Sequence, residues 1–241
     1  MEILNYIFLV LIGAGAGFVQ RVSGFGLGIF AMIFLPHIMS SHTDAATISS
    51  IFACVTATYN AICYRKDVEI KIALPMMCAA LISIPIAVHF AAVIPGDIFK
   101  ILLGVVLVAL GIYFIFLNKN IKIAPTFTNG IIAGTLGGVL GGLFSTGGPP
   151  AVLYVSSATE KNITYFATIQ FYFCFTNIYA TTMRAINGII HFDIIIYALI
   201  GITGCMLGDF AGRLVFNRLD SKKLKLIIYI GMLVSGIIMI V

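Results

Sequence analysis

The chain has 241 residues, of which 61% are hydrophobic and 10% are charged, and its mean hydropathy is +1.11. Soluble domains carry about 25% charged residues, so this composition excludes a soluble domain and indicates one membrane domain over residues 1–241. Lysines and arginines in cytoplasmic loops would account for the formal net charge of +5. Nucleic-acid binding is not expected, because no solvated basic face is available. We therefore expect a multi-pass protein of the cytoplasmic (inner) membrane, in contact with the lipid bilayer.

The amino terminus and the cysteines carry no processing or metal signal. Glu2 is present where a signal peptide would have a basic region, so no cleaved signal peptide is expected. The five cysteines are scattered through apolar segments without CxxC spacing, which argues against a zinc site or a disulfide framework. We expect neither a metal nor a cofactor.

Apolar stretches divide the chain into ten expected helical segments. They fall at about 3–19, 26–39, 44–63, 70–93, 97–117, 127–143, 149–158, 163–186, 192–215 and 222–241. A full membrane span needs roughly 20 residues, and the segments 26–39 and 149–158 are too short. Each of the two follows a glycine-rich break. We therefore predict helical hairpins that penetrate half of the membrane at 3–39 and 127–158, each followed by three full spans.

The two glycine-rich breaks are the most informative positions. The second reads Ser145–Thr146–Gly147–Gly148 and is followed by Pro149–Pro150, and the first covers Gln20–Gly26. Irregular backbone at membrane depth survives only where protein or a water-filled cavity surrounds it. Broken helices inside a hydrophobic chain are typical of transporter binding sites.

The two hairpin-containing halves resemble each other at one ungapped offset of 121 residues. Gly13, Gly17 and Gly26 fall on Gly134, Gly138 and Gly147, Ala46–Ile48 falls on Ala167–Ile169, and Ser83, Ala87 and Ala91 fall on Gly204, Gly208 and Gly212. Small residues in steps of four let helices approach closely in lipid. The expected fold is an all-α integral membrane protein with two repeats, 1–120 and 121–241, of about five helical segments each.

Loop charges set the expected orientation. One hairpin plus three spans crosses the membrane an odd number of times, so the second repeat must be inverted. With both termini extracytoplasmic, the basic residues gather inside: Arg65, Lys66, Lys71, Lys119, Lys122, Lys161, Arg218, Lys222, Lys223 and Lys225. Only Lys100 and Arg184 stay near the outer loops, as the positive-inside rule requires. Inverted repeats are typical of secondary transporters with alternating access.

Polar residues form a stripe on the third helix of each half. Gln170, Cys174, Asn177 and Thr181 step by four, three and four and share one helix face. The offset places Ser49, Ala53, Thr56 and Asn60 at the equivalent positions. Such side chains face the interior of a bundle, either around a substrate cavity or in hydrogen bonds between helices. The substrate-binding candidates from the stripes are Gln170, Asn177, Ser49, Thr56 and Asn60.

The breaks supply the expected anion chemistry. A helix N-terminus presents free N–H groups and a positive dipole end, glycine permits close approach to a ligand, and hydroxyl groups add donors. Two such tips meeting near the midplane would suit a tetrahedral oxyanion. The candidates are Gln20, Arg21, Ser23, Gly24, Gly26, Ser145, Thr146, Gly147 and Gly148. Arg21 is either a cationic partner of the substrate or a paired arginine, and Asp209 with Arg213 predicts a local ion pair.

Three segments carry recognisable motifs: GFVQRVSGFGLGIFAMIFLP, GLFSTGGPPAVLY and GCMLGDFAGRLVFNRLDSKKLK. With these the chain resembles, over nearly its whole length, the TauE/SafE family of sulfite/sulfonate exporter-like permeases. The resemblance implies transport of sulfur-containing anions such as sulfite, sulfonates or sulfoacetate-like compounds. The chain has Ser145–Thr146 where many members have glycine and a small apolar residue, and QRVSGFG where GIGGG is commoner. Both departures concern the substrate.

The expected function is therefore a secondary transporter that moves small sulfur-containing oxyanions by alternating access. An enzyme is not expected, because no histidine is placed to activate Ser145, the one candidate nucleophile at a turn. A passive anion channel and a permease for a non-sulfur organic anion are the alternatives. The sequence leaves open the anion, the direction, the coupling ion and the oligomeric state, for which a homodimer is one arrangement.

Overall fold

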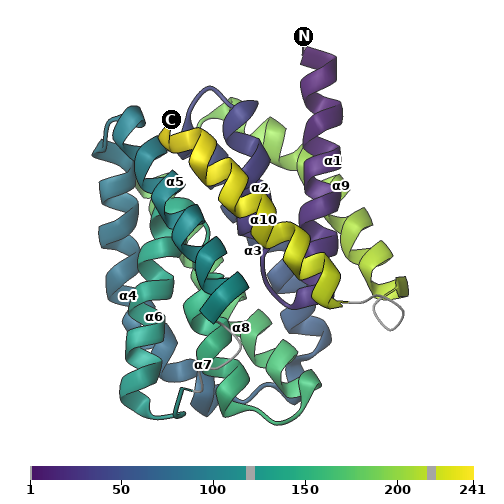
Figure 1. Cartoon of the computed structure of the whole chain (residues 1–241), viewed down its shortest axis with the longest axis vertical. Coiled ribbons are helices and arrows are strands. Elements are labelled where there is room, and N and C mark those ends of the chain that lie inside the picture. Colours follow the sequence, from purple (N-terminus) through teal and green to yellow (C-terminus); the bar gives the residue numbers. More distant parts are fainter. Residues whose placement is uncertain (1, 118–122, 216–220) are drawn as a thin grey trace.

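The computed structural model describes residues 2–117, 123–215 and 221–241, and these residues are helical without any strand (Figure 1). The first half contains α1 (Glu2–Ser23), α2 (Leu27–Phe34), η1 (Leu35–His37), α3 (His42–Cys63), η2 (Arg65–Asp67), α4 (Ile70–Val93), α5 (Gly96–Ile112) and the π-helical η3 (Tyr113–Leu117). The second half contains α6 (Phe127–Phe144), α7 (Gly148–Ala158), α8 (Asn162–Ile186), α9 (Phe192–Val215) and α10 (Ser221–Ile240). The all-α membrane fold is thereby confirmed. Lys119, Lys122 and Arg218, expected in inner loops, lie outside the described residues.

Both predicted breaks are present, and each has a residue in the left-handed region of backbone conformation. In the first, Gly24 and Gly26 have φ of 80° and 94°, which glycine adopts without steric penalty. In the second, Ser145 has φ of 58°. The breaks end α1 and α6 and let the short helices α2 and α7 fold back. We call residues 24–26 the first tip and residues 145–147 the second tip.

Six helices of the described ranges are long and apolar enough to cross a membrane, namely α1, α3, α4, α5 with part of η3, α6 and α9. The 25-residue α8 has sufficient length but is not among them. Gln170, Asn177 and Arg184 lower its mean hydropathy, and two of these three side chains are fully buried. A polar helix is tolerated at this place because the surrounding helices shield it from lipid.

Glycine allows two pairs of helices to pack with their backbones in contact. α1 packs along α9, and α6 packs along α4. A Cβ atom on Gly208 would overlap the carbonyl oxygen of Ala14, and a Cβ atom on Gly134 would overlap the backbone of Met76. The close approach predicted from the small-residue steps is therefore found at both interfaces.

The contacts between helices are consistent with a two-fold repeat. If each helix is replaced by its counterpart in the other half (α1 by α6, α4 by α9), the same principal helix pairs are in contact. The exchange turns the α1–α9 contact into the α6–α4 contact and leaves the α3–α8 and α5–α10 contacts unchanged. Figure 1 shows α5 and α10 side by side, with the start of α1 and the end of α10 toward the same end of the molecule. This pattern favours two inverted repeats at 1–120 and 121–241, which stay a prediction together with the orientation across the membrane.

Candidate functional site

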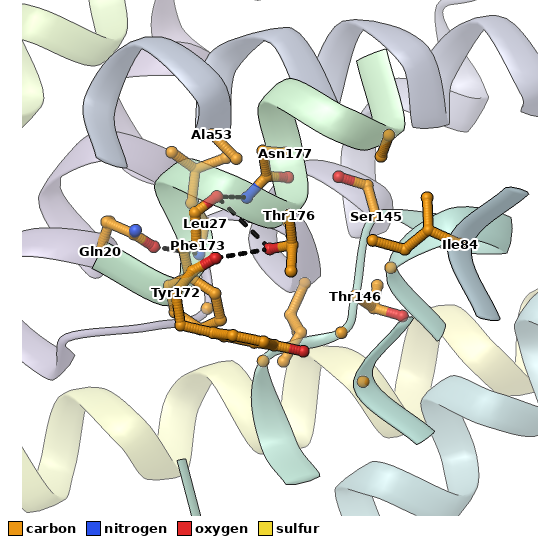
Figure 2. Close-up of a pocket in the computed structure, with 18 residues that line it drawn as sticks. Gln20, Leu27, Ala53, Ile84, Ser145, Thr146, Tyr172, Phe173, Thr176 and Asn177 are labelled. Atoms are coloured by element: carbon orange, nitrogen blue, oxygen red, sulfur yellow. Dashed lines mark hydrogen bonds between the residues drawn. The ribbon is translucent and has the colours of Figure 1, made fainter. Parts of the chain in front are cut away.

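A cavity of about 40 Å³ lies where the two tips meet α8. It is lined by Gln20 of α1 and Gly26 of the first tip, by the second tip with Gly148 of α7, and by Ala53 of α3. Figure 2 shows Gln20 at one side of the view, Ser145 and Thr146 at the other, and the α8 residues between them. No charged side chain lines this cavity in the part of the chain that the structure describes.

Three hydroxyl groups at the cavity are buried without a protein partner. They belong to Ser145, Thr146 and Tyr172, whose residues are 8%, 1% and 1% exposed, and none has a hydrogen-bond partner within the described ranges. A buried hydroxyl left unsatisfied costs about 1–3 kcal/mol. Three unsatisfied hydroxyls at one cavity indicate a binding site for a polar ligand or for water.

Local geometry explains why the hydroxyls of the second tip are free. The backbone N–H groups of Ser145 and Thr146 donate to the carbonyl oxygens of Gly141 (3.0 Å) and Leu140 (3.2 Å), which satisfies the end of α6 in the manner of a helix C-cap. The backbone therefore needs no help from the two side chains. Ser145 is held in the left-handed region, which costs a non-glycine residue about 1–2 kcal/mol. Such a conformation at a cavity is typical of a functional site.

The two short helices offer different numbers of backbone donors. The residues of the first turn of α2, Leu27, Gly28 and Ile29, all line the cavity, and N–H groups of a first turn have no acceptor inside their helix. The Leu27 N–H group reaches the side-chain oxygen of Gln20 at 3.4 Å. The first turn of α7 contains Pro149 and Pro150, which have no N–H group. The first turn of α7 keeps only the N–H group of Gly148 beside the cavity, so the N-terminus of α2 offers more backbone donors.

Glycines bring the two tips into contact. A Cβ atom on Gly28 would overlap the carbonyl oxygen of Ser145, and one on Gly147 would overlap the carbonyl oxygen of Gly137. The first contact joins the N-terminus of α2 to the second tip, and the second folds that tip back onto α6. The cavity wall depends on both close approaches.

A pair of glutamines holds the first tip. The Gln20 amide nitrogen donates to the Gln170 side-chain oxygen at 3.1 Å, and the Gln170 amide nitrogen donates to the carbonyl oxygen of Gly24 at 2.8 Å. Gln170 is fully buried but does not line the cavity. Gly24 and Ser23 also lie off the cavity, and the Ser23 hydroxyl donates to the carbonyl oxygens of Val19 and Phe25. These three candidates therefore support the tip from behind.

The face that α8 turns toward the cavity is rotated from the predicted stripe. It carries Tyr172, Phe173, Thr176, Asn177 and Ala180, so only Asn177 belongs to both sets. Asn177 donates one amide hydrogen to the carbonyl oxygen of Phe173 at 2.8 Å, and the rest of its amide is available to a ligand.

Of the predicted stripe on α3, only Ala53 lines the cavity, and the polar members of the stripe do not. Thr56 donates to the carbonyl oxygen of Phe52 at 2.9 Å, within its own helix. Asn60 is occupied by Arg21 and Asp209, and Ser49 is fully buried away from the cavity. Hydrogen bonding between and within helices thus accounts for Thr56 and Asn60, the alternative that the sequence left open.

Arg21 lies outside the cavity in a network of its own. Its guanidinium donates to the side-chain oxygen of Asn60 at 2.8 Å and to the Tyr64 hydroxyl. Asn60 in turn donates to Asp209 at 3.1 Å, and Asp209 forms the predicted ion pair with Arg213 at 3.8 Å. This geometry favours the second interpretation of Arg21, that of a paired arginine, because Asn60 links it to the carboxylate of Asp209.

Two buried side chains in or beside this site were not predicted from the sequence. Arg184, which we expected near an outer loop, is fully buried in the last turn of α8 and donates to the carbonyl oxygen of Gly142 at 2.7 Å. Tyr172 was treated as part of an apolar run. The spacing of Tyr172, Thr176 and Ala180 by four residues each was the signal for a second α8 face. Among the described residues, no three His, Cys, Asp or Glu side chains gather into a metal-ligand group.

Comparison with known proteins gives one match. The family model described as sulfite exporter TauE/SafE matches residues 9–239, which is nearly the whole chain. No curated protein and no solved structure matches the chain. The match includes both tips and all of the residues that line the cavity.

Proposed function

We propose, from the premise that the chain belongs to the sulfite exporter TauE/SafE family, that the cavity between the two tips is the binding site of its anion. Members of this family are membrane transporters of sulfur-type anions. The site would bind a small sulfur oxyanion and release it on alternate sides of the cytoplasmic membrane. The residues that we assign to binding are Gln20, Gly26, Gly28, Ser145, Thr146, Tyr172 and Asn177.

The single observation that carries the proposal is the set of three unpartnered hydroxyls on Ser145, Thr146 and Tyr172. The first turn of α2 lines the same cavity. Its N–H groups and positive dipole end favour negative charge. No carboxylate lines the described cavity to repel an anion. Uncharged donors of this kind can bind an oxyanion without a metal.

The size of the cavity favours a compact anion. About 10–15 Å³ on this measure holds one water molecule, so a cavity of about 40 Å³ admits an anion of a few heavy atoms. Sulfite and the smallest sulfonates meet this limit. A sulfoacetate-like compound would need the tips to move apart.

Phe25 offers a route for release toward one side. It lies between the two left-handed glycines of the first tip, is 5% exposed, and lines a second cavity of about 270 Å³ with Lys161 and Tyr165. Gly148 of the central cavity lies next to Phe25, because a Cβ atom there would come within 3.6 Å of the Phe25 Cβ atom. Rotation at Gly24 and Gly26 would move the ring and join the two cavities, which is one half of an alternating-access cycle.

The test is sulfite counterflow in proteoliposomes with the parent protein and with Ser145→Ala, Thr146→Val and Tyr172→Phe combined. A carrier shows saturation and counterflow, and the triple variant should lose both while staying folded. Linear flux with single-channel currents would instead establish a passive anion channel. Saturable transport of a carboxylate, without transport of sulfite or methanesulfonate, would support a permease for a non-sulfur anion.

A further inference from the structure

Arg184 is a fully buried cation with no acidic partner in the part of the chain that the structure describes. Its Nη2 atom donates to the carbonyl oxygen of Gly142 at 2.7 Å, its Nη1 atom donates to the Thr47 hydroxyl at 3.3 Å, and its Nε atom has no partner among the residues described. The one ion pair found in the described ranges is that of Arg213 with Asp209. Charged groups inside a membrane protein usually pair with one another or mark an ion pathway.

Arg184 lies at the end of the central cavity. It follows Ala180 by one helical turn on α8, and Ala180 lines the cavity. Its acceptor, Gly142, directly follows Gly141 of the cavity wall and precedes Ser145 of the second tip by three residues. The guanidinium therefore lies beside this end of the cavity without lining it.

The charge of Arg184 is balanced only in part. The carbonyl groups at the C-terminus of α6 amount to about half a negative charge, and Arg184 donates to two of them, on Gly142 and Leu143. Arg21 differs, because Asn60 links it to the carboxylate of Asp209. A net positive potential is thus left beside the hydroxyls of the second tip.

We propose that Arg184 sets the charge selectivity of the cavity: its field favours anions, and dianions more than monoanions, while its bond to Gly142 holds the second tip in place. Arg184 is a positioning and specificity-determining residue, because it does not touch the substrate. The inference rests on the proposed function, since it assumes that the anion binds in the cavity. A bound anion would complete the charge balance of the buried guanidinium.

The first experiment removes the charge. Arg184→Gln and, as a control, Arg65→Gln in the exposed turn η2 are compared with the parent protein by calorimetry with methanesulfonate and with sulfate. A unit charge roughly 10 Å away at an effective dielectric constant of about 20 changes affinity about ten-fold for a monoanion and about a hundred-fold for a dianion. Arg184→Gln should show these two losses, and Arg65→Gln should show neither.

The second experiment keeps Arg184 and cancels its charge, so the test does not depend on the folding of Arg184→Gln. Thr47→Asp places a carboxylate beside the Nη1 atom, and Thr47→Asn is its uncharged control of the same shape. Only the aspartate variant should lose affinity, again more for sulfate than for methanesulfonate. Arg184→Lys should keep the parent ratio of the two affinities.

Equal losses for the two anions, or equal behaviour of Thr47→Asp and Thr47→Asn, would overturn the inference and leave Arg184 as a cap of α6. Parent protein that binds neither anion nor sulfite in its cavity would contradict the proposed function itself. Parent protein that binds them, with Arg184→Gln unchanged, would contradict only the role of Arg184.

Discussion

The two tips break their helices at equivalent places but bring different chemistry to the cavity. The first has two left-handed glycines, a first helical turn with its N–H groups, and Gln20. The second has a left-handed serine, two free hydroxyls, and a helix that opens with Pro149 and Pro150. The first tip thus supplies mainly backbone donors and the second mainly side-chain donors. A repeated architecture can therefore build an asymmetric site, because its helix ends are equivalent in position and free to differ in residue type.

The arginines that accompany the two tips, Arg21 and Arg184, also differ in their surroundings. The offset of 121 residues pairs Arg21 with Gly142, and the carbonyl oxygen of Gly142 accepts a hydrogen bond from Arg184. Each tip is thus accompanied by one arginine, which comes from α1 in the first half and from α8 in the second. The first lies away from the cavity and is linked through Asn60 to Asp209, which also pairs with Arg213. The second bonds to carbonyl groups at the end of the cavity, so its charge acts more strongly there.

The largest effect is expected at the glycine that folds the second tip back onto α6. A Cβ atom on Gly147 would overlap the Gly137 carbonyl oxygen and lie 3.0 Å from the Gly141 backbone. Gly147→Ala should destabilise the protein by about 3 kcal/mol or more, since rigid backbone cannot yield as a side chain does, and anion binding should be lost. Gly148→Ala is the matched control, because its Cβ atom would meet ordinary contacts of 3.5 Å and longer. Thermal unfolding in detergent measures both, and equal stability of the two variants would contradict the predicted tip packing.

The second largest effect is expected at Ser145, where two substitutions separate the contribution of the hydroxyl to binding from the cost of the left-handed backbone. Loss of a hydrogen bond to a charged ligand costs about 1.5–3 kcal/mol, so Ser145→Ala should weaken sulfite binding roughly ten- to hundred-fold. Ser145→Gly should weaken it as much, and it should also raise stability by about 1 kcal/mol, because glycine relieves the left-handed strain. Calorimetry and thermal unfolding on the same samples test this. Parent affinity in both variants would place anion recognition elsewhere.

The hairpins and the breaks could be predicted from the sequence, because backbone rules determine them. Pro149–Pro150 fit only the first turn of a helix, and Gly24 and Gly26 adopt a left-handed backbone that ends one, so the two breaks followed from residue type. The close helix contacts at Gly134 and Gly208 followed from the steps of small residues in the same way.

The cavity face of α8 could not be predicted, because helical periodicity groups residues into faces without saying which neighbour each face meets. Polar residues were taken to mark the cavity, yet Gln170 and Asn60 bond to other protein groups and Ala53 lines the wall. Arg184 was assigned to an outer loop from its place near a helix end. Its burial depends on the carbonyl groups of α6, which are distant in sequence.

A smaller effect is expected from filling the cavity without disturbing the tips. Gly141 lines the cavity, and a Cβ atom there would lie 3.7 Å from its nearest neighbour in Gly147. Gly141→Ala should leave the fold intact or stabilise it by about 0.5–1 kcal/mol, since alanine favours a helix interior. An added methyl group in a binding pocket costs about 1 kcal/mol at the low end, so methanesulfonate affinity should fall roughly five-fold. Unchanged affinity for methanesulfonate would mean that the anion does not use this wall.

The smallest effect on affinity is expected at Arg21, and it tests the comparison of the two arginines directly. Arg21 does not line the cavity, and Asn60 connects it to Asp209, whose carboxylate also pairs with Arg213, so its charge is partly compensated within the protein. Arg21→Gln should therefore change sulfite affinity by less than about three-fold, because interactions of a compensated charge at a distance are weak. Calorimetry of Arg21→Gln beside Arg184→Gln measures the difference. A loss at Arg21 as large as that at Arg184 would show that the first tip, too, contributes charge to the anion.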